Sequence, residues 1–207
     1  MTSQKFITIK VILFIFIILL IDQIVKIYIK THFYIGQSVP IFSWFKISFV
    51  ENPGMAFGLK LGGGEIGKII LTLFRIVAVA ILAIFIRNLI KSGARSGFIL
   101  TIALVLVGAA GNIIDSMFYG VLFNQSTESQ IAQFLPPSGG YAPFLQGYVV
   151  DMLYFPIFHF PAWVPIFGGA LFFSPVFNIA DSVITIAIFL IIFFFLKDLN
   201  KSLEKKK

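Results

Sequence analysis

Residues 97–119 read GFILTIALVLVGAAGNIIDSMFY, and they are the most informative segment about the architecture of the chain. It is apolar for long enough to cross the roughly 30 Å of hydrocarbon in a bilayer, at about 1.5 Å of helix per residue. Near its end, Gly108, Gly111, Asn112 and Asp115 recur with the spacing of one helix face. Lipid does not solvate such polar groups, whereas small residues let a second helix approach closely. The stretch therefore predicts a membrane helix whose polar face is packed inside a helix bundle.

Three more apolar runs in the chain have a similar length. We expect four transmembrane helices at about residues 6–29, 66–90, 97–119 and 176–196, with outer loops over 30–65 and 120–175. The composition agrees, because 58% of the 207 residues are hydrophobic and only 12% are charged. So many apolar side chains must face lipid. The sequence predicts a single membrane-embedded domain over residues 1–207.

The basic residues gather at the ends of these runs. They precede the first run, separate the second from the third and follow the last. The net charge of the chain is +7. Such clusters mark the cytoplasmic side, so both termini are expected to be cytoplasmic. The first run is too long for a cleavable signal peptide, and no small-residue cleavage site follows it. The lysine tail is short and lacks aromatic partners, so we expect no nucleic-acid partner.

The residue types exclude several classes of hydrolase. The chain has no cysteine, and its two histidines are His32 and His159. A thiol nucleophile and an HExxH zinc site are therefore excluded, and we expect no metal or cofactor. Both histidines fall outside the expected spans, which argues against an intramembrane serine–histidine protease. The aspartates Asp115 and Asp181 lack the GxGD motif of another intramembrane protease class.

The outer loops differ in character along their length. Phe45-Lys46-Ile47-Ser48-Phe49 alternates apolar and polar side chains, which predicts a strand, and Asn52-Pro53-Gly54 predicts a turn. A small β element on the membrane surface is therefore expected. Residues 120–147 are rich in Ser, Gln, Gly and Pro, whereas residues 152–175 are dense in Phe, Trp and Pro and suit a membrane interface.

Charged side chains within a membrane span are costly, and each requires a physical reason. The runs contain Asp22, Lys26, Arg75, Asp115 and Asp181. The expected topology brings the three aspartates near the outer ends of their helices. Asp22 and Lys26 are four residues apart and can pair along one helix face. A pair such as Asp22 and Lys26 is more often structural than catalytic, Asp115 could have either role, and we assign Arg75 no function.

A further carboxylate, Asp151, follows the apolar Tyr148-Val149-Val150, and Asn178 shares a helix face with Asp181. Asn178, like Asn112, could orient a carboxylate or simply join helices. Two close carboxylates in a poorly hydrated site share one proton, as in an aspartic protease. The same pair could serve as a proton relay in a small proton-coupled membrane transporter. The residue pattern alone leaves both functions open.

Five short motifs, in the same order, resemble those of the lipoprotein signal peptidases (signal peptidase II). They extend from the first predicted helix to the last, and together they are highly specific. IDQIVK at 21–26 resembles D-Q-x-x-K, ENPGMAFG at 51–58 resembles N-x-G-x-A-F-G, and GAAGNIID at 108–115 resembles G-x-x-G-N-x-x-D. VVD at 149–151 and FNIADS at 177–182 resemble the two segments that carry the family's catalytic aspartates.

The resemblance implies an all-α membrane protein with four transmembrane helices and a small extracytoplasmic β-cradle. It implies an aspartyl endopeptidase of the bacterial cytoplasmic (inner) membrane, with its active site near the outer face. Such an enzyme contacts membrane lipid and removes the signal peptide from diacylglyceryl-modified prolipoproteins, just before the lipidated cysteine. The cyclic peptide globomycin would inhibit it, and no cofactor is implied.

The resemblance also implies residue roles. Asp151 and Asp181 would be the catalytic pair. Residues that shape or support the site would be Asp22, Lys26, Asn52, Gly54, Gly108, Asn112, Asp115, Asn178 and Ala180. The sequence departs from the family at Ser116, where an arginine is usual, so another residue would have to supply a charge partner for Asp115. It also has a longer stretch than usual before Asp151, so that 120–147 resembles an insertion in an exposed loop.

Overall fold

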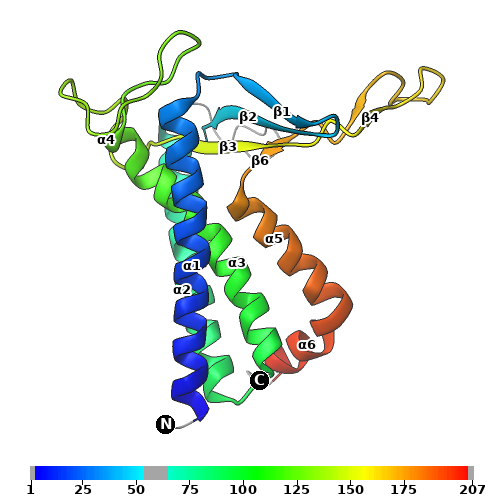
Figure 1. Cartoon of the computed structure of the whole chain (residues 1–207). Coiled ribbons are helices and arrows are strands. Elements are labelled where there is room, and N and C mark those ends of the chain that lie inside the picture. Colours follow the sequence, from blue (N-terminus) through cyan, green and yellow to red (C-terminus); the bar gives the residue numbers. More distant parts are fainter. Residues whose placement is uncertain (1–2, 54–64, 205–207) are drawn as a thin grey trace. The chain divides into compact units, whose positions relative to one another are not determined.

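The structure, a computed structural model, describes residues 3–53 and 65–204 and forms two compact units (Figure 1). The first unit comprises the chain up to Ile24, Ile70–Ile114, and the chain from Ile179 onward. The second unit comprises Val25–Ile69 and Asp115–Asn178. The first contains most of the helical residues, and the second contains the strands and the long connecting segments.

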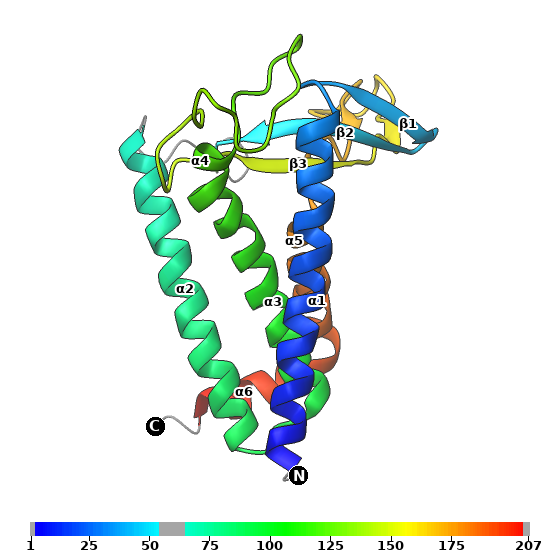
Figure 2. The same ribbon diagram turned by 60° about the vertical axis from the view of Figure 1, so that its left-hand side comes forward.

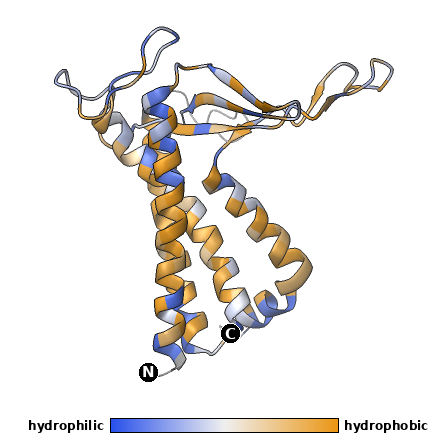
Figure 3. Cartoon of the chain, in the orientation of Figure 1, coloured by the Kyte–Doolittle hydropathy of each residue, from blue (hydrophilic) through white to orange (hydrophobic). Residues whose placement is uncertain are grey.

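The predicted number of membrane helices is confirmed. Among the described residues, four helices are long and apolar enough to cross a membrane, and their ribbons are predominantly hydrophobic in Figure 3. Two are the single helices α1 (Ser3–His32) and α2 (Glu65–Lys91). The third comprises α3 (Ser96–Ile114), the π-helical turn η1 (Asp115–Tyr119) and α4 (Gly120–Leu122). The fourth comprises α5 (Ile179–Leu190), the π-helical turn η2 (Ile191–Phe195) and α6 (Leu196–Glu204).

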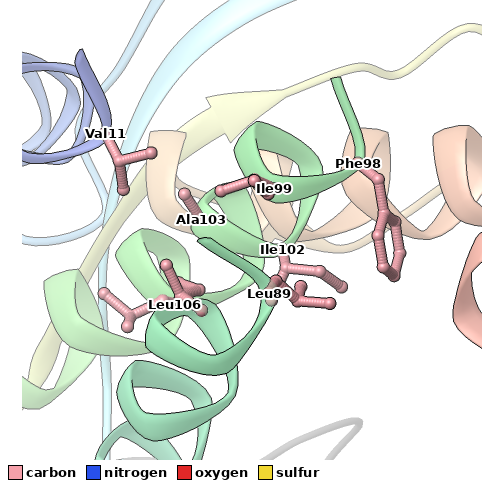
Figure 4. Packing of buried hydrophobic residues seen from close by; sticks show 8 residues of the cluster. Val11, Leu89, Phe98, Ile99, Ile102, Ala103 and Leu106 are labelled. Atoms are coloured by element: carbon pink, nitrogen blue, oxygen red, sulfur yellow. The ribbon is translucent and has the colours of Figure 1, made fainter. Parts of the chain in front are cut away.

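Aliphatic and aromatic side chains from several helices form the core of the first unit (Figure 4). Val11 of α1 and Leu89 of α2 meet the buried face of α3, which includes Phe98, Ile102 and Leu106. Most other apolar side chains of α1 and α2 are exposed in the chain by itself. This distribution suits helices that face lipid on one side and a small protein core on the other.

Two glycines of α3 allow neighbouring helices to approach closely, α5 at Gly108 and α1 at Gly111. A Cβ atom added to Gly108 would lie 2.4 Å from the carbonyl oxygen of Ala180, and one added to Gly111 would lie 2.8 Å from the carboxylate of Asp22. Both distances are shorter than any ordinary contact. The predicted role of the small residues on this helix face is therefore consistent with the packing.

A small antiparallel sheet organises the second unit. Its strand order is β1 (Ser38–Phe42), β2 (Phe45–Asn52), β3 (Val149–Tyr154) and β6 (Val176–Phe177), and Figure 2 shows the first three side by side. The predicted strand at residues 45–49 is confirmed as the first part of β2. The predicted turn at 52–54 includes Gly54, which lies outside the described residues.

One expected helix boundary is wrong. We expected the fourth span to begin at residue 176, but Val176–Phe177 forms strand β6, and helix α5 begins at Ile179. A β-branched and an aromatic side chain follow Pro175, and such residues favour a strand that can pair with a neighbour. Here the neighbour is β3, in which Leu153 pairs with Phe177. Apolar composition alone does not distinguish such a strand from the first turn of a membrane helix.

The segment 120–147, which the sequence identified as an insertion, packs against the sheet. Phe123 and Ala132 are buried in a cluster with Phe49 of β2 and Val150 and Met152 of β3. A backbone hydrogen bond also joins the end of the segment to the residues before its start, because the N–H of Gly147 donates to the carbonyl of Ser116 at 2.8 Å. A separate two-stranded hairpin, β4 (Phe158–His159) and β5 (Leu171–Phe172), lies within the aromatic stretch.

Candidate active site

Asp151 is a buried carboxylate near the start of strand β3. Its side chain is 3% exposed. The amide of Asn178 donates to one carboxylate oxygen at 2.7 Å, and the amide of Asn52 donates to the other at 3.2 Å. Asn52 ends strand β2, opposite Val149, so it is a diagonal neighbour of Asp151 on one face of the sheet. Two segments distant in sequence from Asp151 therefore donate side-chain amides to its carboxylate.

Asp115 and Lys26 form a buried ion pair beside the same strand. Their charged atoms are 2.8 Å apart, and both side chains are 0% exposed. Asp115 also accepts a hydrogen bond of 3.2 Å from the backbone N–H of Val150. Lys26 thus supplies the charge partner of Asp115 that Ser116 does not provide. The carboxylate connects η1 to the residue immediately before Asp151.

Asp22 binds the beginning of helix α5 within the first unit. Its buried carboxylate accepts a hydrogen bond of 3.0 Å from the backbone N–H of Ala180. The first N–H groups of a helix have no partner inside the helix, so this contact caps α5 from another helix. Gln23 also donates to Asp22 at 3.1 Å and to the carbonyl of Gly111 at 3.3 Å. The spacing allows Asp22 to pair with Lys26; in the structure Asp22 contacts the start of α5, and Lys26 contacts Asp115.

Asp181 lies in the first turn of α5 and is partly buried. The amide of Asn112, on α3, donates to its carboxylate at 2.8 Å. The predicted polar faces of the two helices thus meet through Asn112 and Asp181, as the spacing on α3 suggested. Asp181 belongs to the first unit and Asp151 to the second, and each has its own surroundings.

Two of the aspartates contact asparagine amides, and the other two contact a lysine and a helix terminus. Asp151 and Asp181 each accept hydrogen bonds from asparagine side chains, which carry no charge. In contrast, Asp115 has a lysine partner and Asp22 holds a helix terminus. An amide donor directs a carboxylate oxygen without adding a charge, whereas a lysine adds a positive charge beside the carboxylate.

A second buried polar cluster, in the second unit, was not predicted from the sequence. Lys30 pairs with Glu51, and Ser126 contacts both side chains. Their signals were present, since Lys30 is a cation in the last turn of an apolar helix and Glu51 directly precedes the Asn52 motif. Nearby, burial raises the pKa of the Tyr141 hydroxyl, which accepts a hydrogen bond of 2.6 Å from the N–H of Tyr148.

Comparison with known proteins supports one family. The lipoprotein signal peptidase of Porphyromonas gingivalis is 44% identical over 92% of this chain and 84% of its own length. That of Amoebophilus asiaticus is 36% identical over 83% of this chain and 71% of its own length. Two solved structures, each described as a bacterial membrane enzyme, are 26% and 27% identical and superpose with TM-scores of 0.58 and 0.57. They cover 93% and 91% of this chain, and 90% and 94% of their own.

The family model described as signal peptidase (SPase) II matches residues 14–197. This range includes every described residue of the four motifs at 21–26, 108–115, 149–151 and 177–182, together with Asn52. The protein is therefore a membrane-helix-containing member of the signal peptidase II family of peptidases.

Proposed function

We propose that this protein is an aspartyl endopeptidase that removes the signal peptide from diacylglyceryl-modified prolipoproteins, cutting just before the lipidated cysteine. One observation supports the proposal beyond family membership: asparagine amides donate hydrogen bonds to the carboxylates of both Asp151 and Asp181. The relatives named as lipoprotein signal peptidases suggest the substrate.

Asp151 and Asp181 would form the catalytic pair. The contact between Asp151 and Asn178 supports this pairing, because Asp181 follows Asn178 by only three residues. Three residues of extended chain span at most about 11 Å between Cα atoms. The capping of α5 by Asp22 limits the freedom of the same stretch. Asp181 therefore has only a short tether to the residue that contacts Asp151.

The pair would hold one proton between two carboxyl groups. The ionised carboxylate takes a proton from water, and the resulting hydroxide attacks the carbonyl carbon before the cysteine. The protonated carboxyl group donates to the carbonyl oxygen as the tetrahedral intermediate forms. When the C–N bond breaks, the leaving amine receives a proton from the pair. Asn112 and Asn178 would orient the carboxylates or stabilise the developing oxyanion.

The remaining features suggest how a membrane substrate reaches the pair. The chain would act as one domain in a bacterial inner membrane, with both termini cytoplasmic and the sheet and active site near the outer face. The signal helix of the precursor would enter laterally and its diacylglyceryl group would stay among the lipids. The Phe, Trp and Pro residues of 152–175 would help to hold the cleavage segment extended. A proton-coupled transporter is disfavoured, because the chain belongs to a peptidase family.

The proposal is tested with purified protein in detergent and a synthetic prolipoprotein that carries diacylglyceryl-cysteine. We expect one cut, located by mass spectrometry immediately before the modified cysteine, and we expect globomycin to prevent it. The Porphyromonas gingivalis relative, assayed in the same detergent, is the positive control. Cleavage by the relative but not by well-folded protein would contradict the proposal. A proton-flux assay in liposomes would then test the transporter alternative.

A further inference from the structure

Lys30 is a buried cation at the end of α1 that the proposed mechanism does not use. Its side chain is 0% exposed, and it forms an ion pair with Glu51, whose side chain is 6% exposed. The ammonium group also donates to the hydroxyl of Ser126 at 3.1 Å, and that hydroxyl donates to Glu51 at 2.9 Å. The three side chains therefore form a closed triangle away from solvent.

The segment 120–147 supplies most of the surroundings of this cation. Ser126 belongs to it, and so do Phe123 and Tyr141, whose ring centres lie 5.4 Å and 4.9 Å from the ammonium group. Aromatic faces at such distances attract a cation. A buried ammonium group is tolerated only where its partners are well placed. Within the second unit, the segment is consequently fastened to the end of α1.

The other end of the triangle lies beside Asp151. Glu51 pairs with Val150 across β2 and β3, and the next residue, Asn52, donates to the carboxylate of Asp151. Successive side chains of a strand point to opposite faces. Glu51 therefore points to the face of Lys30 and the 120–147 segment, and Asn52 points to the face of Asp151. Asn52 is also the last residue of β2, where a strand is most easily displaced.

We propose that Lys30, Glu51 and Ser126 form a positioning network that fastens the 120–147 segment to the end of β2 and thereby holds Asn52 against Asp151. The network rests on the proposed function, because it acts through Asp151. It gives the insertion a role: the segment provides the hydroxyl and the aromatic faces that make a buried lysine possible at this point.

The mildest test compares two serines of the same segment. Ser126→Ala removes the shared hydroxyl, whereas Ser138→Ala makes the same change at an exposed position. We expect Ser126→Ala to lower kcat about tenfold with little change in KM, as loss of an outer-shell partner does. An added protease should also cut within 120–147 faster in this variant. Equal kcat and equal protease sensitivity in the two variants would overturn the network.

A second test removes the cation. Lys30→Met leaves Glu51 buried without its partner, and we expect kcat to fall about 10- to 100-fold. Adding Glu51→Gln removes the uncompensated charge and should restore part of the loss. Lys10→Met, an exposed change on the same helix, is the control. If Lys30→Met lowered only the yield of folded protein, with kcat and KM of the folded fraction unchanged, Lys30 would be a structural residue and the proposal would be wrong.

The two proposals fail in different ways. If the unchanged protein cuts no prolipoprotein, the proposed function is wrong, and the protease-sensitivity comparison still decides whether Ser126 fastens the segment. If the unchanged protein is active and both Ser126→Ala and Lys30→Met retain full kcat, the peptidase stands and the positioning network is wrong.

Discussion

The amide of Asn178 donates a 2.7 Å hydrogen bond to the carboxylate of Asp151, and both side chains are buried. The bond joins strand β3 to the residue immediately before helix α5. An amide fixes the direction of a carboxylate without adding a charge. Asn178 is therefore suited to orient Asp151 for proton transfer.

Replacing Asn178 with leucine keeps a similar volume and removes this donor. We expect kcat/KM for prolipoprotein cleavage to fall about 10- to 100-fold, because the carboxylate loses its orientation. Initial rates in detergent measure the effect. Asn200→Leu, at an exposed position of α6, is the control and should retain activity. Full activity in Asn178→Leu would show that Asn52 alone suffices to orient Asp151.

The Lys26–Asp115 pair should matter far more for stability than the exposed pair of Arg95 and Asp198. Lys26→Met leaves a buried carboxylate without its cation and should destabilise the fold by about 3–5 kcal/mol. Arg95→Met breaks a surface pair and should change stability by about 0–1 kcal/mol. Unfolding in detergent measures both, and a double variant with Asp115→Asn should recover part of the loss. Equal effects of the two single changes would contradict the assigned burial.

Gly108 tests the close approach of α3 and α5. A methyl group there would lie 2.4 Å from a backbone oxygen of Ala180, which cannot move without displacing the helix that carries Asp181. Gly108→Ala should therefore destabilise the protein by about 1–3 kcal/mol and reduce cleavage. Gly97→Ala is the matched control on the same helix, because its methyl group would meet only the flexible end of the Phe195 side chain. Thermal unfolding and cleavage assays measure the stability and the activity of both variants.

Tyr141 should make the protein less stable in alkali. Burial raises the pKa of its hydroxyl above the ordinary value of 10.0, so the folded state keeps a proton that the unfolded state loses. The stabilisation is complete below pH 10 and falls at higher pH by about 1.4 kcal/mol per pH unit. Tyr141→Phe should remove this component of the slope, at a cost of about 1 kcal/mol at neutral pH from the lost hydrogen bond.

The control for this pH dependence is Tyr34→Phe, which changes an exposed tyrosine of the same unit. Unfolding free energies measured between pH 8 and pH 11 should differ in slope between the two variants above about pH 10. Identical slopes would mean that Tyr141 ionises as readily in the folded protein as in the unfolded chain.

Much of the fold could be predicted because membrane spans depend on local composition. A run of about twenty apolar residues predicts a membrane helix, and all four helices were found among the described residues. The start of the fourth was misplaced because Val176 and Phe177 are as apolar as the helix that follows. Their strand conformation depends on pairing with β3, a partner more than twenty residues earlier in the chain, and periodicity within a window does not contain that information.

The candidate site was predictable only as a set of residue types. The spacing of Asn112 and Asp115 predicted that both lie on one face of the third membrane helix, but it did not predict their partners. Lys26 binds Asp115, which is distant in sequence, because tertiary packing brings η1 beside α1. The Lys30–Glu51–Ser126 triangle joins three segments, and the positions of Lys30 and Glu51 in the sequence do not show that the two side chains meet. Such clusters become visible only when the chain is folded.

The most direct test of the central claim is single-turnover cleavage of a diacylglyceryl-modified prolipoprotein by Asp151→Asn and Asp181→Asn. Asp198→Asn, the same chemical change on the surface of α6, is the matched control. We expect both site variants to fold in detergent and bind substrate but to cut it at least about a thousandfold more slowly, whereas the control should cut normally. Substantial cleavage by either folded site variant would contradict the assignment of Asp151 and Asp181 as the catalytic pair.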